Sequence, residues 1–262
     1  MNATPTSRLA AMAHTMPVPP VGLLRKAAIA LLIAALALVL MSQFTDLDVA
    51  LADRSFDTAL HRFAWRDTWF ADAFMHRWVK LPLIVLGSAL VLVALVEAVL
   101  QRPRLGAANR WRLRVSALIT LIVPLVISLV KHQSASHCPW GIDRYGGNAA
   151  HLRLLDSVPA GFELGGCFPA GHASSALWLA GLCVWWLPRR PRTAAAVFAA
   201  GLAAGFALGW VQQMRGAHFL SHTLWSIWIT AAVIWTALFG LALVHRARLR
   251  SPPVAAPDTP AA

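Results

Sequence analysis

Histidines gather in two short polar stretches that stand where long apolar runs begin. Residues 168–174 carry His172, and residues 215–222 carry His218 and His222. Ionisable groups at the edge of a membrane-embedded run are costly and are usually functional. Imidazoles serve as nucleophiles, acids and bases near neutral pH. The two stretches therefore predict an active site.

Cationic side chains accompany these histidines. Lys131 ends an earlier apolar run, and Arg215 opens the second histidine stretch. Gly171 follows a Pro-Ala pair at an expected helix start, where free backbone N–H groups can hold an anion. Taken alone, Lys131 is explained as a snorkelling anchor at the membrane surface. Its convergence with an arginine and histidines suits phosphate, by charge and by number of hydrogen-bond donors.

The apolar runs predict an all-α polytopic membrane protein. The 262 residues are 58% hydrophobic and 13% charged, with a mean hydropathy of +0.60, which is too apolar for a soluble domain. A six-helix bundle is expected at 23–245, between disordered cytoplasmic tails at 1–22 and 246–262. Runs long enough to cross a bilayer occur at 27–44, 81–100, 113–130, 172–187, 193–211 and 219–244.

The distribution of charge predicts an orientation. The tails and the loops around 101–114 and 188–193 hold 14 of the 23 Lys and Arg residues, but only Glu97 and Asp258 of the 11 acids. The segments on the other side are balanced, with nine of each sign. The net charge of +12 is therefore positive-inside topology rather than a nucleic-acid surface. We expect both termini in the cytoplasm of a bacterial cell and the histidines at the periplasmic face of its inner membrane.

Two other features lie on the outer side. Cys138 and Cys167 bracket a Gly- and Pro-containing loop in an oxidising compartment, so a disulfide is plausible; a metal site including His132 and His137 is the weaker alternative, because the spacing is not that of a zinc site. Aromatic residues between 65 and 78 follow helical spacing. They predict an amphipathic interfacial helix that anchors the fold.

The polar blocks resemble those of the type 2 phosphatidic acid phosphatase superfamily of integral membrane lipid phosphatases, over roughly 79–244. The family pattern is Lys with Arg-Pro seven and eight residues later, then Pro-Ser-Gly-His, then Ser-Arg, five residues, His, three residues, Asp. The corresponding residues here are Lys131 with Cys138-Pro139, then Pro169-Ala170-Gly171-His172, and then the segment from Gly216 to His222 centred on His218. Cys138, Ala170, Gln212 and His222 stand where the pattern has Arg, Ser, Arg and Asp.

The resemblance implies a two-step phosphoryl transfer without a metal or other cofactor. His218 would attack phosphorus, His222 would hold its tautomer, and His172 would protonate the leaving oxygen and then activate water. The phosphate would be bound by Lys131, Arg215, Arg144, Gln212 and the backbone of Gly171. Arg144 and Arg215 would supply the positive charge that Cys138 and Gln212 lack.

The implied substrate is a lipid phosphate held in the bilayer, of the undecaprenyl pyrophosphate, phosphatidylglycerol phosphate, phosphatidic acid or lipid A class. Two alternatives stay open. The same histidines would serve a phosphotransferase that passes the group from undecaprenyl pyrophosphate to a lipid such as lipid A. A catalytically inactive membrane scaffold is the other. The sequence indicates no oligomeric state.

Overall fold

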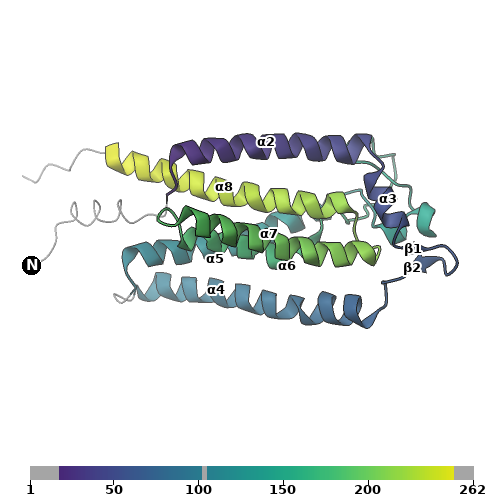
Figure 1. The fold of residues 1–262 in the computed structure, drawn as a ribbon, viewed down its shortest axis with the longest axis horizontal. Helices are drawn as coiled ribbons and strands as arrows, with labels where there is room; N and C mark the ends of the chain where they lie inside the picture. The colour runs from purple at the N-terminus through teal and green to yellow at the C-terminus, as the bar shows by residue number, and fades with distance from the viewer. Residues whose placement is uncertain (1–17, 102–104, 251–262) are drawn as a thin grey trace, which may run out of the picture.

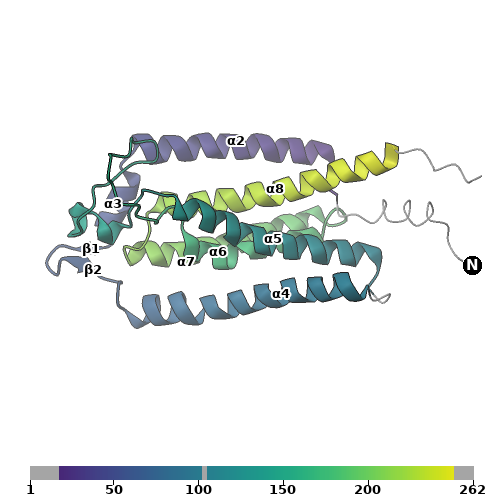
Figure 2. The same ribbon diagram turned by 180° about the vertical axis from the view of Figure 1, so that it is seen from behind.

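The computed structural model of the protein describes residues 18–101 and 105–250, so the expected tails at 1–22 and 246–262 fall largely outside it. The described chain is almost entirely helical (Figure 1). Its long helices lie side by side along one axis, as the view from behind also shows (Figure 2). In chain order the elements are α2 (Val21–Phe44), α3 (Leu47–Asp53), β1 (Phe56–Asp57), β2 (Arg62–Phe63), the π-helix η1 (Trp69–Trp78), α4 (Lys80–Leu100), α5 (Ala107–His132), the 3₁₀ turns η2 (Pro139–Gly141) and η3 (Asp143–Tyr145), α6 (Gly171–Leu177), the 3₁₀ helix η4 (Trp178–Trp185), α7 (Pro191–Met214) and α8 (Leu220–Arg250).

Five helical segments are long and apolar enough to cross a membrane. They are Val21–Phe44, Trp69–Leu100, Ala107–His132, Pro191–Met214 and Leu220–Ala247. Large apolar side chains on their outer faces are exposed, among them Leu32 (70%) and Val99 (80%). Such a surface suits lipid rather than water. The protein is therefore an integral membrane protein.

The fourth span expected from the sequence, at 172–187, is not a sixth helix of that kind. It consists of the seven-residue α6 followed by eight residues of 3₁₀ helix in η4. With rises of about 1.5 and 2.0 Å per residue, the two pieces together reach about 26 Å. Through α6 and η4 the chain still runs back along the bundle. The start of α2 and the end of α8 therefore lie at the same end of the bundle (Figure 1).

Glycines on α7 explain how this shorter segment lies deep in the bundle. A Cβ on Gly201 would come within 2.2 Å of the backbone nitrogen of Ala180, and one on Gly205 within 2.2 Å of the Leu177 side chain. Small residues let neighbouring membrane helices approach closely. Consequently α6 and η4 are buried between α5, α7 and α8, and they carry much of the apolar core.

The interfacial helix expected near 65–78 is instead part of a membrane-length segment. η1 runs into α4 through Val79, so that Trp69–Leu100 forms one candidate span of 32 residues. Its aromatic side chains remain exposed, with Trp69 at 69% and Trp78 at 71%. Exposed aromatic rings at one end of a span are typical of the membrane–water interface.

A compact cap covers the end of the bundle at which the histidines lie. It is built from α3, the β1–β2 hairpin and the loop between α5 and α6 (Figure 1). The Asp48 carboxylate accepts a hydrogen bond of 2.8 Å from the backbone N–H of Ser221, which satisfies a free donor in the first turn of α8. Phe63 packs with Phe219 in a small apolar cluster of the cap. The cap thereby fixes the turn between α7 and α8.

Candidate active site

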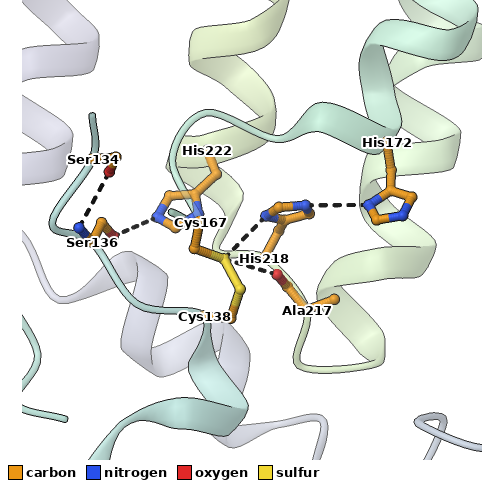
Figure 3. The surroundings of a disulfide bond; sticks show 8 residues. All are labelled: Ser134, Ser136, Cys138, Cys167, His172, Ala217, His218 and His222. Carbon is orange, nitrogen blue, oxygen red and sulfur yellow. Dashed lines mark hydrogen bonds between the residues drawn. A yellow bond between two sulfur atoms is a disulfide. The ribbon is translucent and has the colours of Figure 1, made fainter. Parts of the chain in front are cut away.

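Three segments from different parts of the chain bring the histidines together. Lys131 lies in the last turn of α5, His172 is the second residue of α6, and His218 occupies the turn between α7 and α8. That turn needs a left-handed residue, which Gly216 supplies at φ +76°. The chain reverses there, so His218 points toward the start of α6 (Figure 3).

His172 and His218 face each other directly. Nδ1 of His172 lies 3.5 Å from Nε2 of His218. His218 is only 1% exposed, whereas His172 is half-buried. Two imidazoles in contact, one of them shielded from water, form a pair suited to nucleophilic and acid–base chemistry.

A disulfide forms the wall behind His218. Cys138 and Cys167 are joined (Figure 3), because the backbones on either side of them run together: the N–H groups of Gly166 and Cys167 donate to the carbonyl oxygens of Ser134 and Ser136. The Cys167 sulfur lies 3.4 Å from Nδ1 of His218. Two cysteines joined in this way offer no thiolate, so the alternative of a metal site with His132 and His137 does not fit this structure.

The disulfide bears on the tautomer of His218. An oxidised sulfur has no proton to donate, so a hydrogen bond at this contact has Nδ1–H of His218 as its donor, and the backbone of Cys167 also interacts with this ring. In that tautomer Nε2 of His218 is unprotonated, and it is the nitrogen that faces His172. This is the nitrogen, and the protonation state, that attack on phosphorus requires.

His222 does not hold the ring of His218. Its Nε2 lies 3.2 Å from the Ser136 hydroxyl oxygen, and its ring centre is 5.8 Å from that of His218. Within the described residues, its buried Nδ1 has no hydrogen-bond partner. The tautomer-holding role expected for His222 is therefore not seen, and the Cys167 sulfur makes the contact to Nδ1 of His218 instead.

The expected phosphate ligands divide into two groups. Nζ of Lys131 lies over Gly171, 3.6 Å from where a Cβ would stand on that glycine. Arg215 is buried at the end of α7, where its guanidinium donates to Gln212 Oε1 at 2.9 Å and to a carboxylate oxygen of Asp72 at 2.6 Å. The positive charge of Arg215 is thus largely neutralised by Asp72, and the side-chain oxygen of Gln212 accepts a hydrogen bond from Arg215.

Arg144 is not a ligand in this structure. Its guanidinium donates two hydrogen bonds, of 2.9 and 2.7 Å, to the carboxylate of Asp53, and its side chain is 53% exposed. It lines a separate cavity with Asp53 and Val49. The ion pair raises the pKa of Arg144 and lowers that of Asp53. Arg144 therefore does not supply the positive charge that the sequence pattern lacks.

Two basic residues that the sequence analysis did not single out do lie at the site. The ring centre of His76, from η1, is 4.4 Å from that of His172. Lys80, the first residue of α4, lines the same cavity as Lys131 and His172. Residues four apart on a predicted helix share one face, so the spacing of His76 and Lys80 could have indicated that they act together. The aromatic residues around them instead suggested only a membrane anchor.

Burial and neighbouring charges both keep His218 neutral. Its pKa lies well below the usual 6.5, first because burial disfavours the charged ring and then because a positive charge on the ring would be repelled by Lys131 and by any proton shared with His222 or His172. Burial likewise lowers the pKa of Arg215, against the opposing effect of Asp72. A neutral ring is the nucleophilic form of histidine.

A cavity of about 710 Å³ leads from the site between α4 and α5. Lys80, Lys131 and His172 line one end of it, and apolar side chains line the rest, including Val91 and Leu121. A second cavity of about 590 Å³ lies on the other side, against His222 and Ser136. His218 lines neither cavity, so the His172 ring stands between it and the first.

The sequence model of the PAP2 superfamily matches residues 112–245. The chain belongs to the PAP2 superfamily. No curated protein and no solved structure matches it. The PAP2 match spans α5 to α8 and so includes Lys131, His172 and His218, whereas His76 and Lys80 lie outside it.

Proposed function

We propose that this protein is a membrane lipid phosphatase, which hydrolyses a phosphomonoester or pyrophosphate of a lipid through a phosphohistidine on His218. Membership of the PAP2 superfamily implies phosphatase-type activity on phosphate esters. The observation that carries the specific proposal is the 3.5 Å contact of His172 with Nε2 of His218, whose other ring nitrogen is occupied.

The first step forms a bond between Nε2 of His218 and phosphorus and breaks the bond from phosphorus to the leaving oxygen. His172, protonated when the anionic substrate binds, gives its proton to that oxygen. In the second step water attacks the phosphohistidine, His172 takes the proton of the water, and inorganic phosphate leaves. Lys131 stabilises the negative charge of the transferred group.

Binding must also open the site. The two rings are too close for a phosphate to lie between them, and His172 separates His218 from the cavity. Rotation of the half-buried His172 side chain toward the cavity admits the phosphate, because side chains change rotamer at little cost where they have room. His218, buried on every side, stays in place.

The cavity supports a lipid as the substrate. Its apolar walls lie between two membrane-length helices, so an acyl or prenyl chain can stay in hydrocarbon while its phosphate reaches Lys131 and His172. The charge distribution of the loops supports a periplasmic face for the site, in the inner membrane of a bacterium, with both termini cytoplasmic. Undecaprenyl pyrophosphate, phosphatidylglycerol phosphate, phosphatidic acid and lipid A phosphates share the required chemistry.

Phosphate release by the detergent-solubilised full-length protein tests this function. The substrates are phosphatidic acid, phosphatidylglycerol phosphate and undecaprenyl pyrophosphate, each with and without a chelator. His218→Ala should abolish release, whereas His132→Ala, at an exposed histidine at the end of α5, should not. Release that persists in His218→Ala would refute the nucleophile. No release by the unchanged protein, but transfer to added lipid A, would identify a phosphotransferase.

A further inference from the structure

Lys80 and Lys131 form a pair of ammonium groups with no counter-ion. Both line the 710 Å³ cavity at the end where His172 lies. Among the described residues no carboxylate is within ion-pair distance of either, although Arg77, Arg144, Arg153 and Arg215 each have such a partner. Two like charges facing one partly buried space are unfavourable unless an anion joins them.

His76 extends this basic surface beside His172. The two ring centres are 4.4 Å apart, and Nδ1 of His76 is buried without a hydrogen-bond partner among the described residues. A buried ring nitrogen left unpaired costs free energy that a bound acceptor would recover. Arg215 also acts electrostatically on His76, but its own guanidinium is held by Asp72.

The position of these groups relative to the histidine pair decides which part of a substrate they would meet. The ring centre of His172 is 5.7 Å from that of His218 and 4.4 Å from that of His76. Lys80 lines the cavity together with Lys131 and His172, whereas His218 does not line it. In an in-line transfer the leaving group departs away from the nucleophile, which here is toward the cavity. Lys80 lines that cavity, and His76 lies next to His172.

We propose that Lys80 and His76 form a second phosphate subsite, which binds the phosphate that stays with the lipid when a lipid diphosphate is cleaved. This inference rests on the proposed function and names its substrate class. His218 takes the terminal phosphoryl group, the bond from terminal phosphorus to the bridging oxygen breaks, and His172 protonates that oxygen. Water then releases inorganic phosphate, and the lipid monophosphate leaves from beside Lys80.

A diphosphate explains the basic surface better than a monophosphate does. When a phosphomonoester is cleaved, the leaving oxygen belongs to a neutral alcohol, for which Lys80 and His76 would offer nothing. When a diphosphate is cleaved, the leaving group is itself an anion, and its charge grows as the bridging bond breaks. Cations placed there stabilise the transition state more than the ground state.

The experiment compares two substrates that have the same chain, farnesyl diphosphate and farnesyl monophosphate, on the full-length protein in detergent. Lys80→Met should lower kcat/KM for the diphosphate by about tenfold or more, since a charge-assisted hydrogen bond is lost. It should leave the monophosphate nearly unaffected. His76→Phe, which keeps a ring without its nitrogens, should act in the same direction, and Lys80→Arg should restore most of the activity. Lys26→Met, at an exposed lysine on α2, is the matched control.

Equal losses on both substrates would overturn the proposal, because Lys80 would then bind the reacting phosphate. Unchanged rates on both would also overturn it. A binding measurement keeps this test separate from turnover: inorganic pyrophosphate should raise the melting temperature of the protein more than inorganic phosphate does, and Lys80→Met should remove the difference. Loss of that difference with no phosphate release from either substrate would contradict the proposed function and support the subsite. Equal stabilisation of the unchanged protein by the two anions would contradict the subsite.

Discussion

Loss of the Cys138–Cys167 disulfide should loosen the wall behind His218 and reduce activity. The two cysteines are 29 residues apart, and a cross-link over such a loop removes chain entropy worth about 3 to 4 kcal/mol at 25 °C. Hydrogen bonds from the loop to the turn that carries His218, such as Trp140 N–H to the Gly216 carbonyl, would remain. Reduction should therefore open the loop and the wall rather than unfold the bundle.

Two double variants separate the cross-link from the contact to Nδ1 of His218. Cys138→Ser with Cys167→Ser removes the cross-link but leaves a hydroxyl that can accept the Nδ1 proton, whereas Cys138→Ala with Cys167→Ala removes both. We expect similar falls in melting temperature for the two variants. Phosphate release should fall by about tenfold more in the alanine variant, from the loss of one hydrogen bond to a catalytic ring.

Melting temperature and phosphate release would be measured with and without dithiothreitol, with maleimide labelling to establish reduction. Cys183→Ala, at the buried free cysteine of η4, serves as the control and should stay sensitive to reductant. Full labelling of Cys138 and Cys167 with unchanged melting temperature and unchanged phosphate release would refute the reasoning. Equal activity of the serine and alanine variants would refute the part that concerns the tautomer.

Three further predictions follow from single positions. Gly216→Ala should lower stability by about 2 kcal/mol or more, because φ is +76° there and a Cβ would come within 2.2 Å of the Phe63 ring; an unchanged melting temperature would be contrary to this. Arg144→Ala should leave kcat/KM unchanged and cost about 0 to 1 kcal/mol of stability, since its pair with Asp53 is largely exposed; a clear fall in kcat/KM would restore it as a ligand. Because the pKa of His218 is held below 6.5 in the folded protein, the unfolded chain binds more protons below that pH. Stability should thus fall as the pH drops below about 6.5, and His218→Gln should weaken that dependence if the buried ring causes it.

Much of the site could be predicted from the sequence, because its parts lie at the ends of apolar runs. The positions of Lys131, His172 and His218 at one end of the bundle follow from the spacing of the runs and the alternation of direction. Cys138 and Cys167 form a disulfide in the structure, and the sequence already placed both of them at the ends of one loop on the outer side of the membrane. Such features depend on the order of elements along the chain, which hydropathy records.

Other features depend on tertiary contacts that no local pattern records. Arg144 could not be told from a phosphate ligand until its partner Asp53, on α3, was placed. His76 and Lys80 reach the site because η1, which packs against α7, continues into α4, which packs against α6. The fourth expected span, at 172–187, was expected to be a regular helix from its apolarity, but close contacts with glycines of α7 allow a shorter α and 3₁₀ segment there.

The most direct test of the account is to trap the phosphorylated protein. Full-length protein would be mixed with a lipid diphosphate, quenched with base within the first turnover, and digested, and the peptide that carries phosphate would be identified by mass spectrometry. The account predicts base-stable, acid-labile phosphate on His218, absent from His218→Ala and prolonged in His172→Ala, in which no ring activates water. Phosphate on a different residue, or release of phosphate by the unchanged protein with no labelled peptide at any time, would contradict it.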